Sequence, residues 1–153
     1  MKNGRLFMES TTIEATKTAG EIISLLVQAG ARQIGSEYNE KLQISGIKFT
    51  LEVMPGQIQC FVLPSRVDPV FQIFRKKHPG YLTDSAKSIL TAKAERVAWR
   101  QLYRWAQAQL AMIQCGMVEA QEVFLPYMQH ESGQTLYELM KGRGMKLLAE
   151  KTP

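Results

Sequence analysis

The sequence predicts an α+β domain in which a small, mostly antiparallel sheet of three to four strands packs against an N-terminal helix and a long central amphipathic helix. Two patterns support this class. Residues 44–54 alternate between apolar and polar side chains, as in a strand with one buried and one solvated face. Residues 85–115 repeat apolar side chains at helical spacing, and a helix of that length is about 45 Å long. Short C-terminal helices complete the expected architecture.

The N-terminal third predicts a helix followed by strands. Residues 11–16 alternate weakly, which suggests a short edge strand. A capping box at Thr18–Glu21 predicts the start of a helix that ends near Gly30, because glycine accepts the left-handed conformation of a helix terminator. Pro55–Gly56 fits a tight turn and therefore predicts an antiparallel hairpin. The strands are expected at Gln33–Tyr38, Ile44–Met54 and Gln57–Leu63.

After the strands, the sequence predicts helices. Asp68–Pro69 fits the start of a short helix, because Asp is a favoured N-cap and Pro is favoured at the first helical position. The long helix is expected from Ser85 to Cys115, where Gly116 ends it. A short helix over Glu119–Phe124 and a last one that opens with the capping box Thr135–Glu138 follow.

Composition indicates a globular protein with acidic partners. A chain of 153 residues with 45% hydrophobic and 22% charged residues can bury one core. We expect a single domain over 1–153, with flexible ends at 1–10 and 141–153. The net charge of +5 favours nucleic acid or an acidic protein surface as a partner. No apolar run approaches the about 18 residues that cross a bilayer, and the start of the chain lacks a signal peptide's apolar centre, so we expect a cytoplasmic protein without a membrane partner.

The clearest functional clue is a basic face on the long helix. At 100° per residue, four cations fall within about 80° of the helix circumference, opposite the apolar stripe of Leu102, Trp105, Ala106 and Ile113. Successive arginines would lie about 6 Å apart, close to the phosphate spacing along a nucleic-acid strand. With a second basic cluster, this predicts a nucleic-acid-binding site made of Lys93, Arg96, Arg100, Arg104, Arg75, Lys76 and Lys77.

Each of these features has a structural alternative. A long surface helix needs a polar face, and its arginines could pair with carboxylates of the same fold. Cations at 75–77 suit a helix C-terminus, where the helix dipole favours them. Tyr103 offers a ring for base stacking beside the basic face. Glu95 points to the apolar side, so we expect either an internal ion pair with an arginine or a carboxyl of raised pKa in a pocket.

A second candidate site is the apolar segment around Pro126. It is either a packed turn or an exposed anchor for a partner protein, and the predicted partner-binding residues are Phe124, Leu125 and Tyr127. The apolar stripe of the long helix offers a homodimer interface as another possibility, because about 45 Å exceeds the width of a small sheet.

The sequence predicts no catalytic residue, metal site or cofactor. His78 and His130 have no cysteine, histidine or carboxylate three or four residues ahead that would make a helical metal pair. Cys60 and Cys115 lack metal-ligand spacing, and we expect both to be buried free thiols. A glycine-rich phosphate loop is also absent from the sequence. A non-enzymatic protein is therefore expected.

Several segments resemble small uncharacterised proteins encoded by bacteriophages and integrated mobile elements. The segments are 17–22, 94–100, 105–111, 122–128 and 133–138, and the similarity extends over about 11–138. The resemblance implies a phage-type setting in the host cytosol, where small proteins serve DNA replication, recombination, transcriptional takeover or evasion of host defence. It implies no activity and no residue roles.

These observations favour two functions over a third, an enzyme whose site the sequence does not reveal. The first is a non-enzymatic nucleic-acid-binding accessory protein of a phage or mobile element that uses the basic face. The alternative is a protein–protein inhibitor or adaptor, for example an anti-defence factor that occupies a host protein complex.

Overall fold

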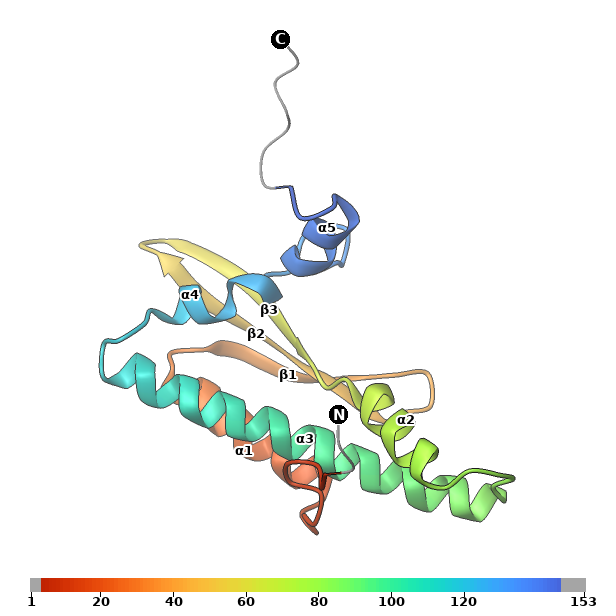
Figure 1. Ribbon diagram of the computed structural model, residues 1–153. Coiled ribbons are helices and arrows are strands. Elements are labelled where there is room, and N and C mark those ends of the chain that lie inside the picture. Colours follow the sequence, from red (N-terminus) through yellow and green to blue (C-terminus); the bar gives the residue numbers. More distant parts are fainter. Residues whose placement is uncertain (1–3, 147–153) are drawn as a thin grey trace.

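A computed structural model of the protein describes residues 4–146 and confirms the α+β class (Figure 1). A helix precedes a three-stranded sheet, and the long helix follows it. The elements in chain order are α1 (Ala15–Gln28), β1 (Arg32–Tyr38), β2 (Ile44–Met54), β3 (Gln57–Pro64), α2 (Val67–Lys77), α3 (Asp84–Gln114), α4 (Ala120–Phe124), the 3₁₀ turn η1 (Leu125–Tyr127) and α5 (Leu136–Gly142).

The sheet is an antiparallel meander in the order β1-β2-β3. Pro55–Gly56 forms the predicted turn between β2 and β3, and Gly56 takes a φ of 77° there. Phe49 pairs with Phe61 across the two strands, and Ile47 pairs with Leu63. All four side chains are buried, so the alternation in β2 does mark a dry and a wet face.

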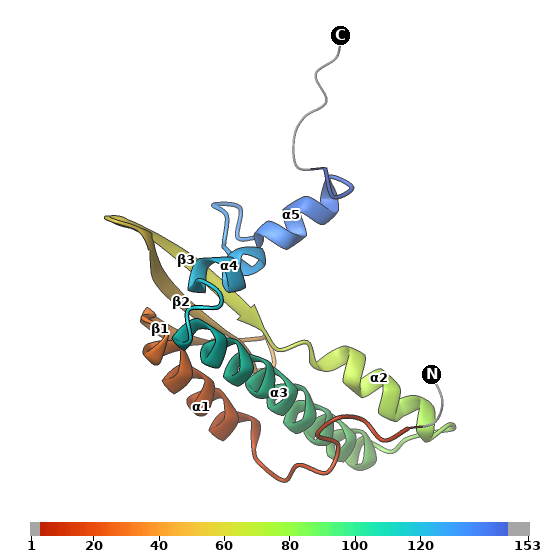
Figure 2. The same cartoon turned by 60° about the vertical axis from the view of Figure 1, so that its left-hand side comes forward.

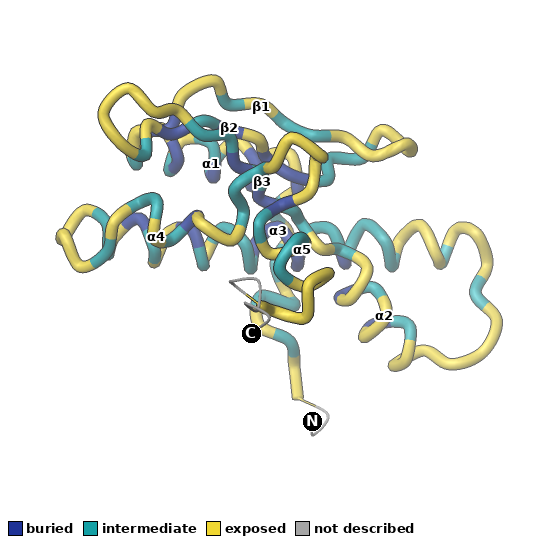
Figure 3. The backbone as a smooth tube through the Cα atoms, turned by 90° about the horizontal axis from the view of Figure 1, so that it is seen from above, coloured by how far each residue is buried: buried dark blue, intermediate teal, exposed yellow. Residues whose placement is uncertain are grey.

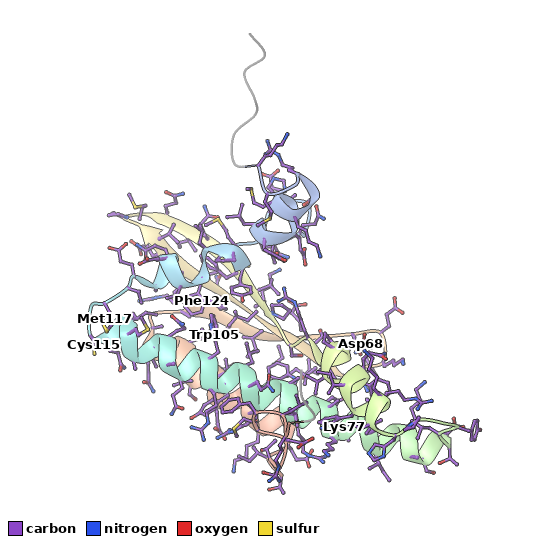
Figure 4. All side chains as sticks on the ribbon, viewed as in Figure 1. Asp68, Lys77, Trp105, Cys115, Met117 and Phe124 are labelled. Carbon is purple, nitrogen blue, oxygen red and sulfur yellow. The ribbon has the colours of Figure 1, made fainter. Side chains whose placement is uncertain are left out.

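Helices α1 and α3 lie side by side against the dry face of the sheet (Figure 2). Trp99 of α3 is fully buried in this core, and the buried residues gather where the sheet meets α1 and α3 (Figure 3). Phe124 closes the other end of the core: its ring lies 5.2 Å from that of Phe49 and 6.1 Å from that of Trp105, measured between centroids (Figure 4). Both pairs are edge-to-face, the arrangement that aromatic quadrupoles favour.

The long helix extends beyond the sheet, as Figure 1 shows. Its second half packs under the sheet beside α1, and its first half packs against α2 in a second, smaller core. Because 31 residues of helix span about 45 Å, one small sheet cannot cover the whole rod. The apolar stripe at Leu102, Trp105 and Ile113 packs on the main core within one chain, so it is not free for the dimer considered above.

Some predicted starts of elements are wrong. Residues 11–14 form no strand, and α1 begins at Ala15, one turn before the predicted capping box. Thr18 is fully buried inside α1, because Ala15, Thr18 and Ile22 together face the core. Helix α2 begins at Val67, so the predicted N-cap residue Asp68 lies in its first turn.

The last helix starts as predicted. The Thr135 hydroxyl accepts a hydrogen bond from the backbone N–H of Glu138 at 3.2 Å, and the Glu138 carboxylate accepts one from the N–H of Thr135 at 3.0 Å. Just before it, the chain contacts the free edge of β3 at one point, where the N–H of Gln129 donates to the carbonyl of Cys60 at 2.8 Å.

The N-terminal segment lies across α2 and α3 (Figure 2). Leu6 packs on the second core. The Phe7 carbonyl accepts a hydrogen bond from the Gln101 amide at 2.8 Å. The ends expected to be flexible fall partly outside the described residues, at 1–3 and 147–153. Within 4–146, none of the helices is both long and apolar enough to cross a membrane.

Candidate binding groove

Arg100, at the centre of the predicted basic face, is buried. Only 8% of the residue is exposed, and its Nη1 lies 2.9 Å from Oε2 of Glu21 on α1. The guanidinium also lies 4.1 Å from the centroid of the Tyr103 ring, on which base stacking was predicted. Arg100 is therefore not a phosphate ligand in this fold, because α1 packs over this side of α3 and supplies the carboxylate.

The other three cations of that face differ in exposure. Lys93 is half-buried, with Nζ 4.5 Å from the centroid of the Phe74 ring. Arg96 is also half-buried, and its Nε has no hydrogen-bond partner among the described residues. Arg104 is exposed and donates to the Gln107 side chain at 3.0 Å. The four cations therefore do not form one continuous exposed surface.

Much of the second basic cluster also serves the fold. Arg75 donates to the carbonyls of His78 and Gly80, each at 2.6 Å, and so caps the end of α2. This is the structural alternative that the sequence offered. Lys76 is exposed, and no side chain in the described part of the chain pairs with it.

Lys77 is held by the N-terminal segment. Its Nζ lies 3.0 Å from Oε1 of Glu9. The hydrogen bond from Lys77 lowers the pKa of Glu9, and the positive charges of Lys77, Lys93 and Arg5 lower it further. One acidic side chain thus partly neutralises this end of the predicted basic face.

The predicted partner-binding segment is mainly core. Phe124 is 2% exposed, so the expectation of an exposed anchor at this residue is wrong. Tyr127 is half-buried with its ring 5.9 Å from that of Trp105, while Leu125 is 45% exposed. These residues pack because the chain returns here to cover the end of the sheet.

A groove with both polar and apolar walls lies where α3 extends past the sheet. Its volume is about 650 Å³, and its walls come from the β1–β2 turn, the β3–α2 junction and the first half of α3. Asp68, labelled in Figure 4, lies in the first turn of α2 and lines this groove. A second hollow of about 390 Å³ continues it across α3 and shares five residues with it: Lys41, Gln43, Lys87, Thr91 and Glu95.

The β1–β2 turn has a fixed shape at the rim of this groove. The Asn39 carboxamide oxygen accepts from the N–H groups of Lys41 and Gln43, at 3.0 and 2.9 Å. Leu42 takes a φ of 59°, unusual for a branched side chain, and is 83% exposed. The turn thereby holds Lys41 and Gln43 at the groove.

The cations of the groove form no ion pair, unlike Arg100 and Lys77. Lys41, Arg66 and Lys87 are exposed, and within residues 4–146 no carboxylate lies close enough to form an ion pair with any of them. They come from three different elements. Asp68, the nearest acidic neighbour in sequence to Arg66, instead accepts from the Gln72 side chain at 3.5 Å.

Glu95 lines both hollows and has no ion pair with any described residue. The expected internal ion pair with an arginine is thus not formed. Burial raises the pKa of this carboxyl above its ordinary value, the charge of Glu14 raises it further, and Arg96 lowers it. The second expectation, a carboxyl of raised pKa at a hollow, describes it better.

The sequence identified Glu95 but missed Lys41, Arg66 and Lys87. One signal was present on α3, where Lys87, Thr91 and Glu95 follow each other at i+4 on the side that becomes apolar further along. That change marks the point where the sheet stops covering the helix. Lys41 and Arg66 gave no such signal, because only tertiary structure brings their loops to α3.

The histidines, cysteines and acidic side chains of the described chain form no metal-binding cluster. The described chain holds no group of three or more His, Cys, Asp or Glu side chains placed to bind a metal ion. Cys60 is half-buried as a free thiol, but Cys115 is exposed, contrary to expectation, because it caps α3 beyond the core. Comparisons of the chain with protein-family models, curated proteins and solved structures found no match.

Proposed function

We propose that the protein binds a nucleic-acid strand without catalysing a reaction, and that the strand lies in the groove beside α3. The observation that supports this is that three cations without ion pairs, Lys41, Arg66 and Lys87, surround one groove and outnumber its two carboxylates, Asp68 and Glu95. Cations that no carboxylate of the fold neutralises are free to displace the counterions of phosphates. This is the electrostatic requirement for binding a strand.

The groove also continues toward another cation. Asp68, Gln72 and Lys76 follow each other at i+4 on α2, and the first two line the groove. Lys76 therefore lies on the same side of α2, one turn beyond. A longer strand in the groove would reach Lys76 as a fourth cation.

This function suits the setting that the sequence resemblance implies. A small basic protein that holds a strand is an accessory factor for replication or recombination of a phage or mobile element, acting in the host cytoplasm. The interface differs from the one expected from sequence, since it lies on the opposite side of α3.

The test is a titration of labelled oligonucleotides by fluorescence anisotropy. We expect the log of affinity for single strands to fall with log salt at a slope of about −2, the value for three neutralised phosphates. The triple variant Lys41→Gln, Arg66→Gln and Lys87→Gln should weaken binding and flatten that slope.

A control triple removes the same charge from exposed cations elsewhere, with Lys17→Gln, Arg32→Gln and Arg104→Gln. It should keep most of the affinity and most of the slope. If the control triple loses binding and the groove triple keeps it, the interface lies elsewhere on the surface and not in the groove. If the wild type binds no oligonucleotide at low salt, the function itself is wrong.

A protein partner is the second candidate, and the exposed Leu42 at the groove rim favours it. An apolar side chain held outward by a rigid turn is suited to insertion into a pocket of a partner. Capture of a host complex by the wild type but not by Leu42→Ser, with oligonucleotide binding absent in both, would establish this adaptor function instead.

A further inference from the structure

Two carboxylates, Asp68 and Glu95, line the groove, where a purely phosphate-binding surface would have none. Asp68 accepts a hydrogen bond from the Gln72 side chain at 3.5 Å. Glu95 lines both hollows, on the same side of α3 as Lys87 and Thr91. Within the described chain it accepts no side-chain hydrogen bond and forms no ion pair. A half-buried carboxylate with unused acceptor oxygens repels a phosphate and attracts an N–H donor.

The neighbouring polar groups separate into two kinds. Lys41, Arg66 and Lys87 offer only N–H donors. Gln43 also retains its N–H₂ group, because its oxygen already accepts from Asn39 at 3.1 Å. Glu95 offers only acceptors while it is ionised. A ligand that satisfies both kinds carries anionic groups and, a short distance away, an exposed N–H donor.

A nucleotide of a single strand has this combination. Its phosphates suit the cations, and an unstacked base exposes its edge for hydrogen bonding. The exocyclic amino groups of cytosine and adenine are donors, and carboxylates accept from cytosine N4. Uracil and thymine present a carbonyl oxygen at the corresponding position, which would face the Glu95 oxygens unfavourably.

Resting on the proposed strand binding, we infer that Glu95 makes the groove selective for single strands whose bases carry an exocyclic amino group, with cytosine preferred over uracil. Lys41, Arg66 and Lys87 hold the phosphates, and the Glu95 carboxylate accepts from the amino group. In a duplex the amino group is occupied by base pairing, so this selectivity belongs to unpaired strands.

The experiment compares deoxycytidine and deoxyuridine homopolymers, because their bases have the same size and differ at the hydrogen-bonding edge. Anisotropy titrations at one salt concentration give two affinities and their ratio. We expect the wild type to bind the cytidine strand at least about tenfold more tightly, the effect of one hydrogen bond to a charged group. Glu95→Gln should reduce the ratio to within about twofold, because its amide both donates and accepts.

Glu14→Gln is the matched control. Glu14 lies near enough for its charge to affect the pKa of Glu95, but it does not line the groove. This variant removes the same charge and should keep the cytidine preference. Glu95→Ala is a second test variant in case the glutamine packs differently, and circular dichroism checks that all variants fold.

The outcomes separate the two claims. Equal affinity of the wild type for both strands, with a salt slope that depends on the groove cations, would overturn the inference about Glu95 and leave strand binding in place. A cytidine preference that survives both Glu95 variants would also overturn it. Failure of every strand to bind at low salt would overturn strand binding, and the inference with it.

Discussion

The outer side of α3, which carries Lys93, Arg96, Arg100 and Arg104, and its groove side, which carries Lys87, Thr91 and Glu95, differ in how their cations are used. On the outer side, Arg100 faces Glu21 of α1, and the N-terminal segment brings Glu9 to Lys77. On the groove side, Lys41, Arg66 and Lys87 face water and a hollow. Arg100 on α3 and Lys77 on α2 are therefore used by the fold itself, whereas the three groove cations are available to a ligand.

This difference follows from what lies next to each side. The outer side runs along α1 and the N-terminal segment, which supply partners to Arg100 and Gln101, while Arg104 one turn further on stays exposed. The groove side passes beyond the end of the sheet, where no element covers it. A helical wheel gives the direction of a side chain but not its neighbour in the fold. It therefore cannot distinguish a cation that forms an ion pair from one that does not.

The largest expected effect is on the paired side. Arg100→Gln should lower the free energy of unfolding by about 2 kcal/mol, because it removes a charged hydrogen bond and leaves Glu21 partly buried without its cation. For a chain of this size, the midpoint of thermal unfolding should fall by about 4–8 °C. Circular dichroism on heating and in urea measures both quantities.

Arg104→Gln is the control for that prediction, since Arg104 lies one turn further along α3 and is exposed. It should change stability by less than about 0.5 kcal/mol. The double variant Glu21→Gln with Arg100→Gln should lose less than the sum of the single losses, because the two residues interact directly. Additive losses would show that the pair contributes nothing and that Arg100 acts through packing alone.

Much of the fold could be predicted because its signals are local. The alternation in β2, the Pro55–Gly56 turn and the capping box at Thr135–Glu138 each depend on a few adjacent residues, and all three were predicted from sequence. The start of α1 could not be, because burial of Ala15 against the core adds a turn before Thr18. Tertiary packing outweighed a good capping sequence.

The candidate site was less predictable than the fold. Glu95 could be singled out because it is a carboxylate on the apolar side of a helix. Nothing near Lys41 or Arg66 in sequence indicated that both would meet α3. The pairing of Arg100 with Glu21 was equally hidden, since the two residues belong to helices far apart in the chain.

On the groove side, substitution of Glu95 should change the free energy of unfolding by less than substitution of Arg100, and it should raise that free energy. Because the pKa of Glu95 is raised in the fold, its contribution to stability is fully present below the ordinary value of 4.5 and is lost as pH rises through the raised value. Glu95→Gln should therefore match the wild type at low pH and exceed it at neutral pH. The gain should stay below about 1 kcal/mol, because the side chain is partly exposed and solvent screens its charge.

Urea unfolding of the two proteins between about pH 4 and about pH 7 measures that difference. A variant that is less stable than the wild type at neutral pH would mean that Glu95 has a favourable partner in the fold. In that case its oxygens would not be free for a ligand.

The smallest change in stability is expected for substitution of Glu9, which pairs with Lys77. Its dependence on pH should be the opposite of that expected for Glu95. The hydrogen bond from Lys77 lowers the pKa of Glu9, so its contribution is present above the ordinary value of 4.5 and is lost as pH falls through the lowered value. Glu9→Gln should match the wild type in strong acid and be slightly less stable at neutral pH, with the difference shrinking as salt screens the pair. Thermal midpoints of Glu9→Gln and Glu95→Gln, measured side by side across this pH range, should move in opposite directions relative to the wild type. If both move the same way, the contrast between a paired and an unpaired side of α3 does not describe how this protein uses its charges.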